Sequence, residues 1–300
     1  MSRVSQLAQQ TLTLDNVLNA QKRIQDAQIQ IATGVKSLSY AGISKQASRL
    51  VSLESLQSRI NQFAKNNTVI EARLQRMDQS VSTIFDSMSE LRRLLIQRIN
   101  ATAGDYVPLA AVAQNLLDVV AGQLNAKENS RFLFAGTRTN TQPVKVPVPD
   151  PTTFGIAEAN YYQGNSTELT TRVDDSIAIS YGMTADRAAF QDVIASLKAA
   201  IQGDATNDAA LLDRSLELAG SAIDALAGFR AEIGADLDTI FRANQRNGDF
   251  LVFVENSITD IIAVDIPEAV TRLASDQTIL QASYLTLARV SSLTLVNFLN

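Results

Sequence analysis

Histidine, cysteine and tryptophan are absent from this 300-residue chain, and their absence excludes several kinds of chemistry. Without histidine or cysteine there is no imidazole base, no thiolate nucleophile and no ordinary zinc or copper site. A Ser-His-Asp triad is therefore impossible. Carboxylates acting with magnesium or calcium remain possible in principle. We nevertheless predict that the chain is not an enzyme and has no catalytic, cofactor-binding or metal-binding residues.

Proline is scarce, and its placement divides the chain. None of the six prolines precedes Pro108, and only Pro267 follows Pro151. Because proline breaks helix interiors, this placement predicts two helical flanks around a non-helical middle. Aromatic residues make up only 6% of the chain, which suits helices that pack closely along their length.

Acidic residues slightly outnumber basic ones, and the formal net charge is -5. This balance argues against nucleic acid as a partner. The first ten residues contain no continuous apolar run, so they do not form a secretory signal peptide. The stretch 279–299 is apolar, but Gln281 and Arg289 argue against a membrane span. We therefore expect neither nucleic acid nor a membrane as a partner.

Apolar residues at steps of three and four predict several long amphipathic helices. The strongest covers about residues 46–100, where roughly 1.5 Å per residue gives a length of about 80 Å and implies a rod. Further helices are expected at about 108–129, 186–202 and 208–240. The last could continue through Ile261 or break near Gly248. The stripe of the strongest helix consists of Ile70, Leu74, Met77, Val81, Ile84, Met88, Leu91 and Leu95.

The middle of the chain, residues 131–184, has strand character. Alternating apolar residues and turn residues predict strands at 131–136, 161–165 and 170–180. Two groups of acidic residues could in principle bind a metal ion, but each better suits a structural role. Adjacent Asp174 and Asp175 suit a turn between strands, and the loop from Asp204 to Asp208 suits a helix N-cap rather than a calcium loop.

Apolar stripes extend along both terminal segments of the sequence. Such stripes need a partner, either each other or further copies of the same chain. We therefore predict that the terminal helices form an assembly interface. Its candidate residues are Leu7, Leu14, Val17, Ile24, Ile31, Leu273, Leu280, Leu287, Leu295 and Leu299.

These elements predict a mainly α fold: a long antiparallel helical rod of coiled-coil type with a small central β-rich insertion and both termini at one end. We expect three parts. Residues 1–42 with 265–300 form a terminal helical assembly module, residues 43–130 with 185–264 form the rod, and residues 131–184 form the insertion. Gly34 and Gly42 bracket a break between the first two helices. That break is either a plain surface loop or a joint that shifts when neighbouring molecules pack.

Four segments carry a resemblance to a known family. Residues 30–36 (QIATGVK), 94–97 (LLIQ) and 280–284 (LQASY) are similar, in order and spacing, to segments of the flagellin superfamily. Residues 131–139 (RFLFAGTRT) and the short insertion resemble the branch of that superfamily that joins the flagellar hook to the filament. A flagellin that forms the filament itself is the alternative within the superfamily.

The resemblance implies a structural subunit of the bacterial flagellum, involved in motility and located outside the cell after type III export with an uncleaved N-terminal signal. It implies assembly with copies of itself, with the neighbouring hook-associated protein and with flagellin, and an export chaperone on the C-terminal helix. Flagellins are also recognised by a host innate receptor through the segment matching 88–97. Here the sequence Ser89-Glu90-Leu91-Arg92-Arg93 departs from the family pattern and leaves that recognition open.

Two other classes of protein are alternatives to this interpretation of the sequence. The cytoplasmic rod of a signalling receptor would share the long helices and the richness in Ala, Ser and Gln. A pure coiled-coil hairpin, however, has no use for the β-rich insertion around residues 131–139. A carboxylate-based hydrolase acting on glycans would need two acidic groups on facing elements, and the sequence shows none that stands out.

Overall fold

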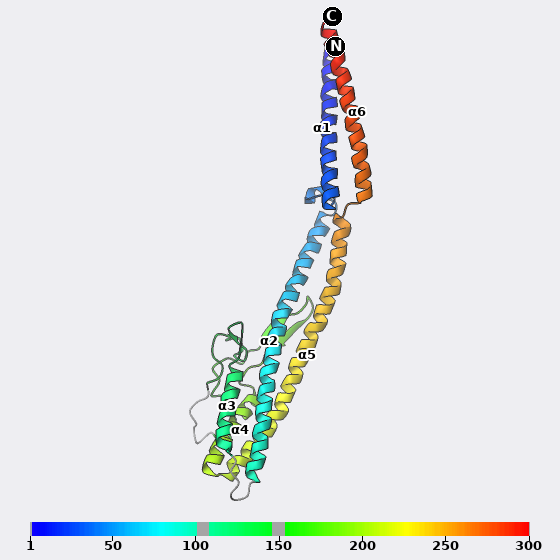
Figure 1. Ribbon diagram of the computed structural model, residues 1–300. Coiled ribbons are helices and arrows are strands. Elements are labelled where there is room, and N and C mark those ends of the chain that lie inside the picture. Colours follow the sequence, from blue (N-terminus) through cyan, green and yellow to red (C-terminus); the bar gives the residue numbers. More distant parts are fainter. Residues whose placement is uncertain (1, 101–107, 146–153, 300) are drawn as a thin grey trace. The chain divides into compact units, whose positions relative to one another are not determined.

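The computed structural model describes residues 2–100, 108–145 and 154–299, and it confirms the mainly α fold (Figure 1). The chain divides into two compact units, Met1–Ser58 with Phe250–Asn300 (unit 1) and Arg59–Asp249 (unit 2). The helices are α1 (Ser2–Thr33), the 3-10 helix η1 (Tyr40–Ile43), α2 (Ala47–Ile99), α3 (Leu109–Leu124), α4 (Ala188–Thr206), α5 (Ala209–Ile262) and α6 (Ile266–Leu299).

The described strands form two small antiparallel hairpins, both in unit 2. One pairs β1 (Lys127–Glu128) with β2 (Arg131–Phe132), and the other pairs β3 (Leu169–Arg172) with β4 (Ala178–Tyr181). The predicted strand at 161–165 is reduced to a single bridge between Tyr162 and Val144. The β-rich middle is therefore smaller than the alternation of apolar residues suggested.

The predicted helix boundaries hold for the longest helices. The expected helix at 46–100 is α2, and α5 continues through Gly248 to Ile262 without a break. The prediction was wrong for the end of α3, which stops at Leu124 rather than near residue 129. The reason is a two-residue hairpin turn at Asn129 and Ser130, whose positive φ angles of 49° and 65° are typical of a type I′ turn.

Unit 2 is built around one apolar core shared by α3, α4 and the unit 2 portions of α2 and α5. Every residue of the predicted α2 stripe from Ile70 to Leu95 is at most 6% exposed. Full burial of such side chains contributes about 1.5–3 kcal/mol each. The other helices contribute, among others, Leu117, Val120, Leu124, Phe190, Val193, Leu197, Leu212, Leu226, Ile233 and Ile240.

Helices α4 and α5 approach each other closely at their connection. The Ser196 hydroxyl donates to the carbonyl of Ser215, and the Ser215 hydroxyl donates to the carbonyl of Ser196, both at 2.8 Å. A Cβ atom added to Gly203 would lie 3.1 Å from side-chain atoms of Leu211 and Leu212. Small residues at these positions therefore allow the tight α4–α5 hairpin.

The middle segment packs into the helical core of unit 2. Phe134, Tyr161 and Val173 are fully buried there, and Phe134 meets Phe190 of α4 edge-to-face with ring centroids 5.8 Å apart. The hydroxyl of Tyr161 donates to the carbonyl of Ala185 at 2.7 Å. Such burial follows from the shortness of the insertion, which has too few apolar residues for a core of its own.

The turn between β3 and β4 is fastened to α2 and α5. Asn67 of α2 and Asn247 of α5 both donate to the carbonyl of Val173, at 3.0 and 3.2 Å. Arg246 of α5 forms an ion pair with the buried Asp174 at 2.8 Å. Three long-range contacts thus position one short turn.

Among the described helices, we find no segment with both the length and the hydropathy that a bilayer crossing requires.

Candidate assembly interface

Helices α1 and α6 of unit 1 pack against each other as an antiparallel pair, so that the start of α1 and the end of α6 lie at the same end of the pair (Figure 1). Val17, Ala20 and Ala27 of α1 are buried, as is Ala269 of α6. With the partly buried Ile24, the three α1 residues have the spacing of three and four that is typical of a coiled-coil seam. The two terminal stripes therefore serve as partners for each other within one molecule.

Six of the ten candidate interface residues are partly or fully buried in unit 1. They are Val17, Ile24, Ile31, Leu273, Leu280 and Leu287. Leu14 behaves differently, with 51% of its surface exposed. Leu7, Leu295 and Leu299 lie on helical backbone, but their side chains fall outside the described residues.

Polar contacts flank the seam and fix its register. Arg23 of α1 and Asp276 of α6 form an ion pair with a distance of 2.9 Å between Nε and Oδ1. Gln21 donates to the hydroxyl of Tyr284 at 2.7 Å. Because Arg23, Gln21 and Tyr284 are exposed, each contact contributes only about 0.5 kcal/mol, and its main effect is on alignment.

A second set of apolar residues remains uncovered on the α1–α6 pair. Leu12 and Leu18 of α1 are 63% and 54% exposed, and Leu285 and Ile279 of α6 are 66% and 47% exposed. With Leu14, they are the outer apolar residues of unit 1, and at about 3.6 residues per turn they lie on both sides of the seam rather than on one face. Sequence reasoning missed these four residues because they fall beside the three-four seam. The detectable signal was the width of the stripe, which is greater than one seam requires.

The break between α1 and α2 is held by a set of hydrogen bonds. Gly34, with a φ of +72°, ends α1 in the left-handed conformation that suits glycine. The Lys36 backbone N–H donates to Ile262 at 2.7 Å, and the Val264 N–H donates to Gly34 at 2.9 Å. Lys36 Nζ donates to the carbonyls of Ile261 and Asp260, at 2.9 and 3.2 Å, and so caps the C-terminal end of α5.

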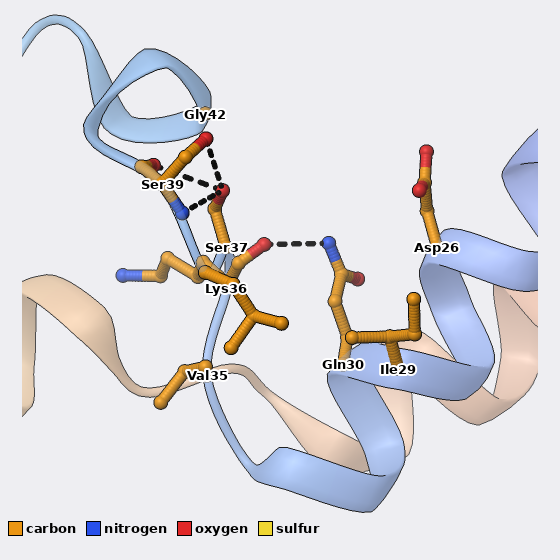
Figure 2. Close-up of a pocket in the computed structure, with 9 residues that line it drawn as sticks. Asp26, Ile29, Gln30, Val35, Lys36, Ser37, Ser39 and Gly42 are labelled. Carbon is orange, nitrogen blue, oxygen red and sulfur yellow. Dashed lines mark hydrogen bonds between the residues drawn. The ribbon is translucent and has the colours of Figure 1, made fainter.

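A pocket of about 410 Å³ lies beside this loop (Figure 2). Asp26, Ile29 and Gln30 of α1 line one side, and loop residues line the other. Gln30 crosses the pocket to donate to the carbonyl of Lys36 at 2.8 Å. The predicted break is therefore an ordered connection with defined contacts to α1 and α5.

The acidic residues that could in principle bind a metal ion have structural partners. The structure confirms that Asp174 belongs to a turn and that Asp208 is a helix N-cap. Asp174 accepts hydrogen bonds from the backbone of Ser176 and Ile177 in the β3–β4 turn. Asp208 Oδ1 accepts from the N–H groups of Ala210 and Leu211, as an N-cap of α5 does. Within the described ranges, no group of three or more acidic side chains is arranged to hold a metal ion.

Comparisons with known proteins agree with this architecture. Residues 216–299 match the bacterial flagellin C-terminal helical region. The chain is 22% identical to flagellar hook-associated protein 3 of Escherichia coli strain K12, over 85% of this chain and 86% of that protein.

Two solved structures share the fold. The crystal structure of Bacillus cereus FlgL has a TM-score of 0.57 at 18% identity and covers 69% of this chain and 99% of that one. The flagellar junction protein FlgL from Legionella pneumophila has a TM-score of 0.53 at 15% identity and covers 70% and 98%.

The fold and the paired terminal helices define a helical protein that resembles the flagellin superfamily, as its segments at both ends predicted. The chain is also similar over most of its length to proteins named flagellar hook-associated protein 3.

Proposed function

We propose that the chain is a structural subunit of the bacterial flagellum that joins the hook to the filament by helical packing, without catalysis. The observation that carries this proposal is the set of outer apolar residues of unit 1, which stay exposed on more than one side after α1 and α6 have paired. The likeness to flagellar hook-associated protein 3 supports the same function. A flagellin that builds the filament itself is the second candidate, favoured only by the match of residues 216–299 to a flagellin region.

The energetics of the outer apolar residues suit assembly. Full burial of a leucine side chain contributes about 1.5–3 kcal/mol, and Leu12, Leu14, Leu18, Ile279 and Leu285 are already about half buried, so covering them supplies roughly 6 kcal/mol in all. This is of the order of the cost of immobilising one molecule on another. A single contact is then marginal, whereas a subunit held by several neighbours is stable.

The three parts expected from the sequence become functional assignments. Residues 1–42 with 265–300 form the assembly module, residues 43–130 with 185–264 form the rod, and residues 131–184 form the insertion. In the assembly module, the outer apolar residues, Leu14 among them, contact neighbouring molecules. The α1–α6 pair itself is held together by Val17, Ile24, Ile31, Leu273, Leu280 and Leu287. Leu7, Leu295 and Leu299 extend the same interface.

The partners follow from this function. They are further copies of the chain, the neighbouring hook-associated protein and flagellin, together with an export chaperone that covers α6 before assembly. The chain reaches the outside of the cell by type III export and acts there as part of the flagellum. The exposed Ile279 and Leu285 support a chaperone on α6, because uncovered apolar side chains otherwise favour premature association.

Replacing outer apolar residues tests the proposal. Leu18→Glu and Leu285→Glu should leave the monomer folded and weaken self-association by about tenfold or more, measured by sedimentation velocity. Val119→Glu, at a 42% exposed position on α3, is the matched control and should not change association. Equal association of all variants would contradict the proposed interface.

Immunogold labelling separates the two flagellar candidates. Gold confined to the hook end of the filament supports the junction subunit. Gold along the whole filament supports a flagellin instead.

A further inference from the structure

A second pocket, of about 230 Å³, lies in unit 2 between α2 and the two β-hairpins. The assembly function makes no use of it. Its polar lining comes from α2, from the two hairpins and from the segment that follows β2. The residues are Arg73, Glu128, Asn129, Arg131, Thr137, Thr139 and Tyr181.

Arg73 is a buried cation that has no carboxylate partner among the described residues. It is only 8% exposed, and its Nη2 donates to the carbonyls of Phe132 and Leu133 at 3.0 and 3.2 Å. Its Nε hydrogen-bonds to none of the described residues, and no described acidic group pairs with it. Two neutral carbonyls offset only part of the desolvation of a guanidinium group.

Arg131 brings a second positive charge to the same pocket. Its side chain is exposed, and within the described part of the chain it forms no ion pair. Burial lowers the pKa of Arg73, and the charge of Arg131 lowers it further, whereas Tyr181 and Glu128 act in the opposite direction. Glu128, on the strand facing Arg131, leaves the lining with one net positive charge.

We propose that this pocket binds a carboxylate group, with Arg131 as the direct ligand, Thr137 and Thr139 as hydroxyl donors and the Arg73 charge as the attracting field. The planar fork of an arginine matches a carboxylate in two parallel hydrogen bonds. One net positive charge balances a monoanion, whereas a phosphate dianion would exceed it and be repelled more strongly by Glu128. The carboxylate comes either from a small free acid or from an acidic side chain of another copy of the chain.

The test titrates the full-length protein with sodium acetate, against sodium chloride at equal ionic strength. The arginine Nε–H signals are followed by NMR. The wild type should show saturable shifts with acetate and not with chloride. Arg131→Gln should weaken the apparent acetate affinity by about tenfold, because it removes the direct ion pair.

Arg138→Gln is the matched control, because Arg138 is an exposed arginine of the same segment that does not line the pocket. It should bind acetate as the wild type does. Shifts that are equal in Arg131→Gln and wild type, or that chloride reproduces, overturn the proposal. Circular dichroism of each variant verifies that it is folded.

The source of the carboxylate is separated by sedimentation. If another copy supplies it, saturating acetate weakens the self-association of wild type but not that of Arg131→Gln. If the ligand is a free acid, acetate binds at the same site and leaves self-association unchanged. Either result is in accord with the pocket as a carboxylate site, provided that the NMR shifts depend on Arg131.

Discussion

Asp174 shows how much structure one carboxylate can organise. It lies in the β3–β4 turn with its side chain only 9% exposed, and it pairs with Arg246 at 2.8 Å. Burial by itself would raise its pKa. Hydrogen bonds from Arg246, Ser176 and Ile177 outweigh burial, and they lower the pKa of Asp174 to about 2. The folded state therefore favours the ionised carboxylate.

Asp174→Asn should lower the free energy of unfolding of unit 2 by about 2 kcal/mol at pH 7, because the ion pair is lost while the turn geometry is kept. Urea unfolding followed by circular dichroism measures this. The exposed neighbour gives a control: Asp175→Asn removes a surface ion pair with Arg59 and should cost less than about 0.5 kcal/mol.

The pH dependence of this stabilisation has a defined direction. Because the pKa of Asp174 is lower in the folded state, its contribution is complete above about pH 4 and is lost as the pH falls towards 2. Wild type and Asp174→Asn should therefore converge in stability near pH 2. A difference that persists undiminished at pH 2 would contradict the role of the charge.

The sequence predicted the place of Asp174 but not its partners. Two adjacent aspartates between alternating apolar residues are sufficient to predict a turn. Arg246 lies 72 residues further along the chain, and no local pattern connects the two. The same holds for Asn67, whose 0% exposure is unexpected for an amide and depends on its contacts with Val173 and Asn244.

At the scale of elements, Lys36 is a positioning residue for the end of α5. Its ammonium group bonds the carbonyls of Asp260 and Ile261, which have no helical partners at a C-terminus. A cation there also complements the partial negative charge of the helix end. The capped end determines where α5 stops and the connection to α6 begins.

Lys36→Met should destabilise this connection by about 1 kcal/mol and so speed hydrogen exchange of the Ala263 and Val264 amides about fivefold. Methionine is unbranched and only one atom shorter than lysine, so the replacement mainly removes the charge and the donors. Lys45→Met, on an exposed lysine shortly before α2, should leave these rates unchanged. Unchanged exchange in Lys36→Met would show that the backbone contacts of residues 34–36 suffice.

The stripes at the two ends were predictable as interfaces, but their partner was not. A spacing of three and four residues identifies a seam without saying which helix covers it. The structure covers the seam of α1 with α6, and it leaves Leu12 and Leu18 outside. Gly248 was equally ambiguous in the sequence, because a glycine can end a helix or lie within one. In the structure α5 continues on both sides of it, and the neighbouring Asn247 donates a hydrogen bond to the carbonyl of Val173.

At the scale of the whole molecule, the two units differ in how much apolar surface they bury. Unit 2 contains the large core, with phenylalanine, leucine and isoleucine side chains from four helices. The fully buried residues of the described α1–α6 seam are one valine and three alanines. Helices that bury little are marginal in water, even when they are long.

Hydrogen exchange of the dilute protein should therefore be faster in α1 and α6 than in the stretch of α2 from Ile70 to Leu95. We expect a difference of at least about a hundredfold, which mass spectrometry of peptic fragments measures directly. Incorporation into an assembly should slow exchange in α1 and α6 selectively, since the outer apolar residues are then covered. Equal protection of both units in the dilute protein would contradict this order of stability.

The pairing of α1 with α6 also has a consequence for synthesis. Its contacts join residues as far apart as Gln21 and Tyr284, which are 263 positions distant. The ribosome synthesises α1 long before α6, the helix that covers it. Val17 and Ala20 therefore stay exposed to solvent until α6 has been translated. A chain interrupted before that point keeps an open seam for quality-control proteases. Closure of the pair is thus a sign, detectable on the folded protein, that translation has continued through α6.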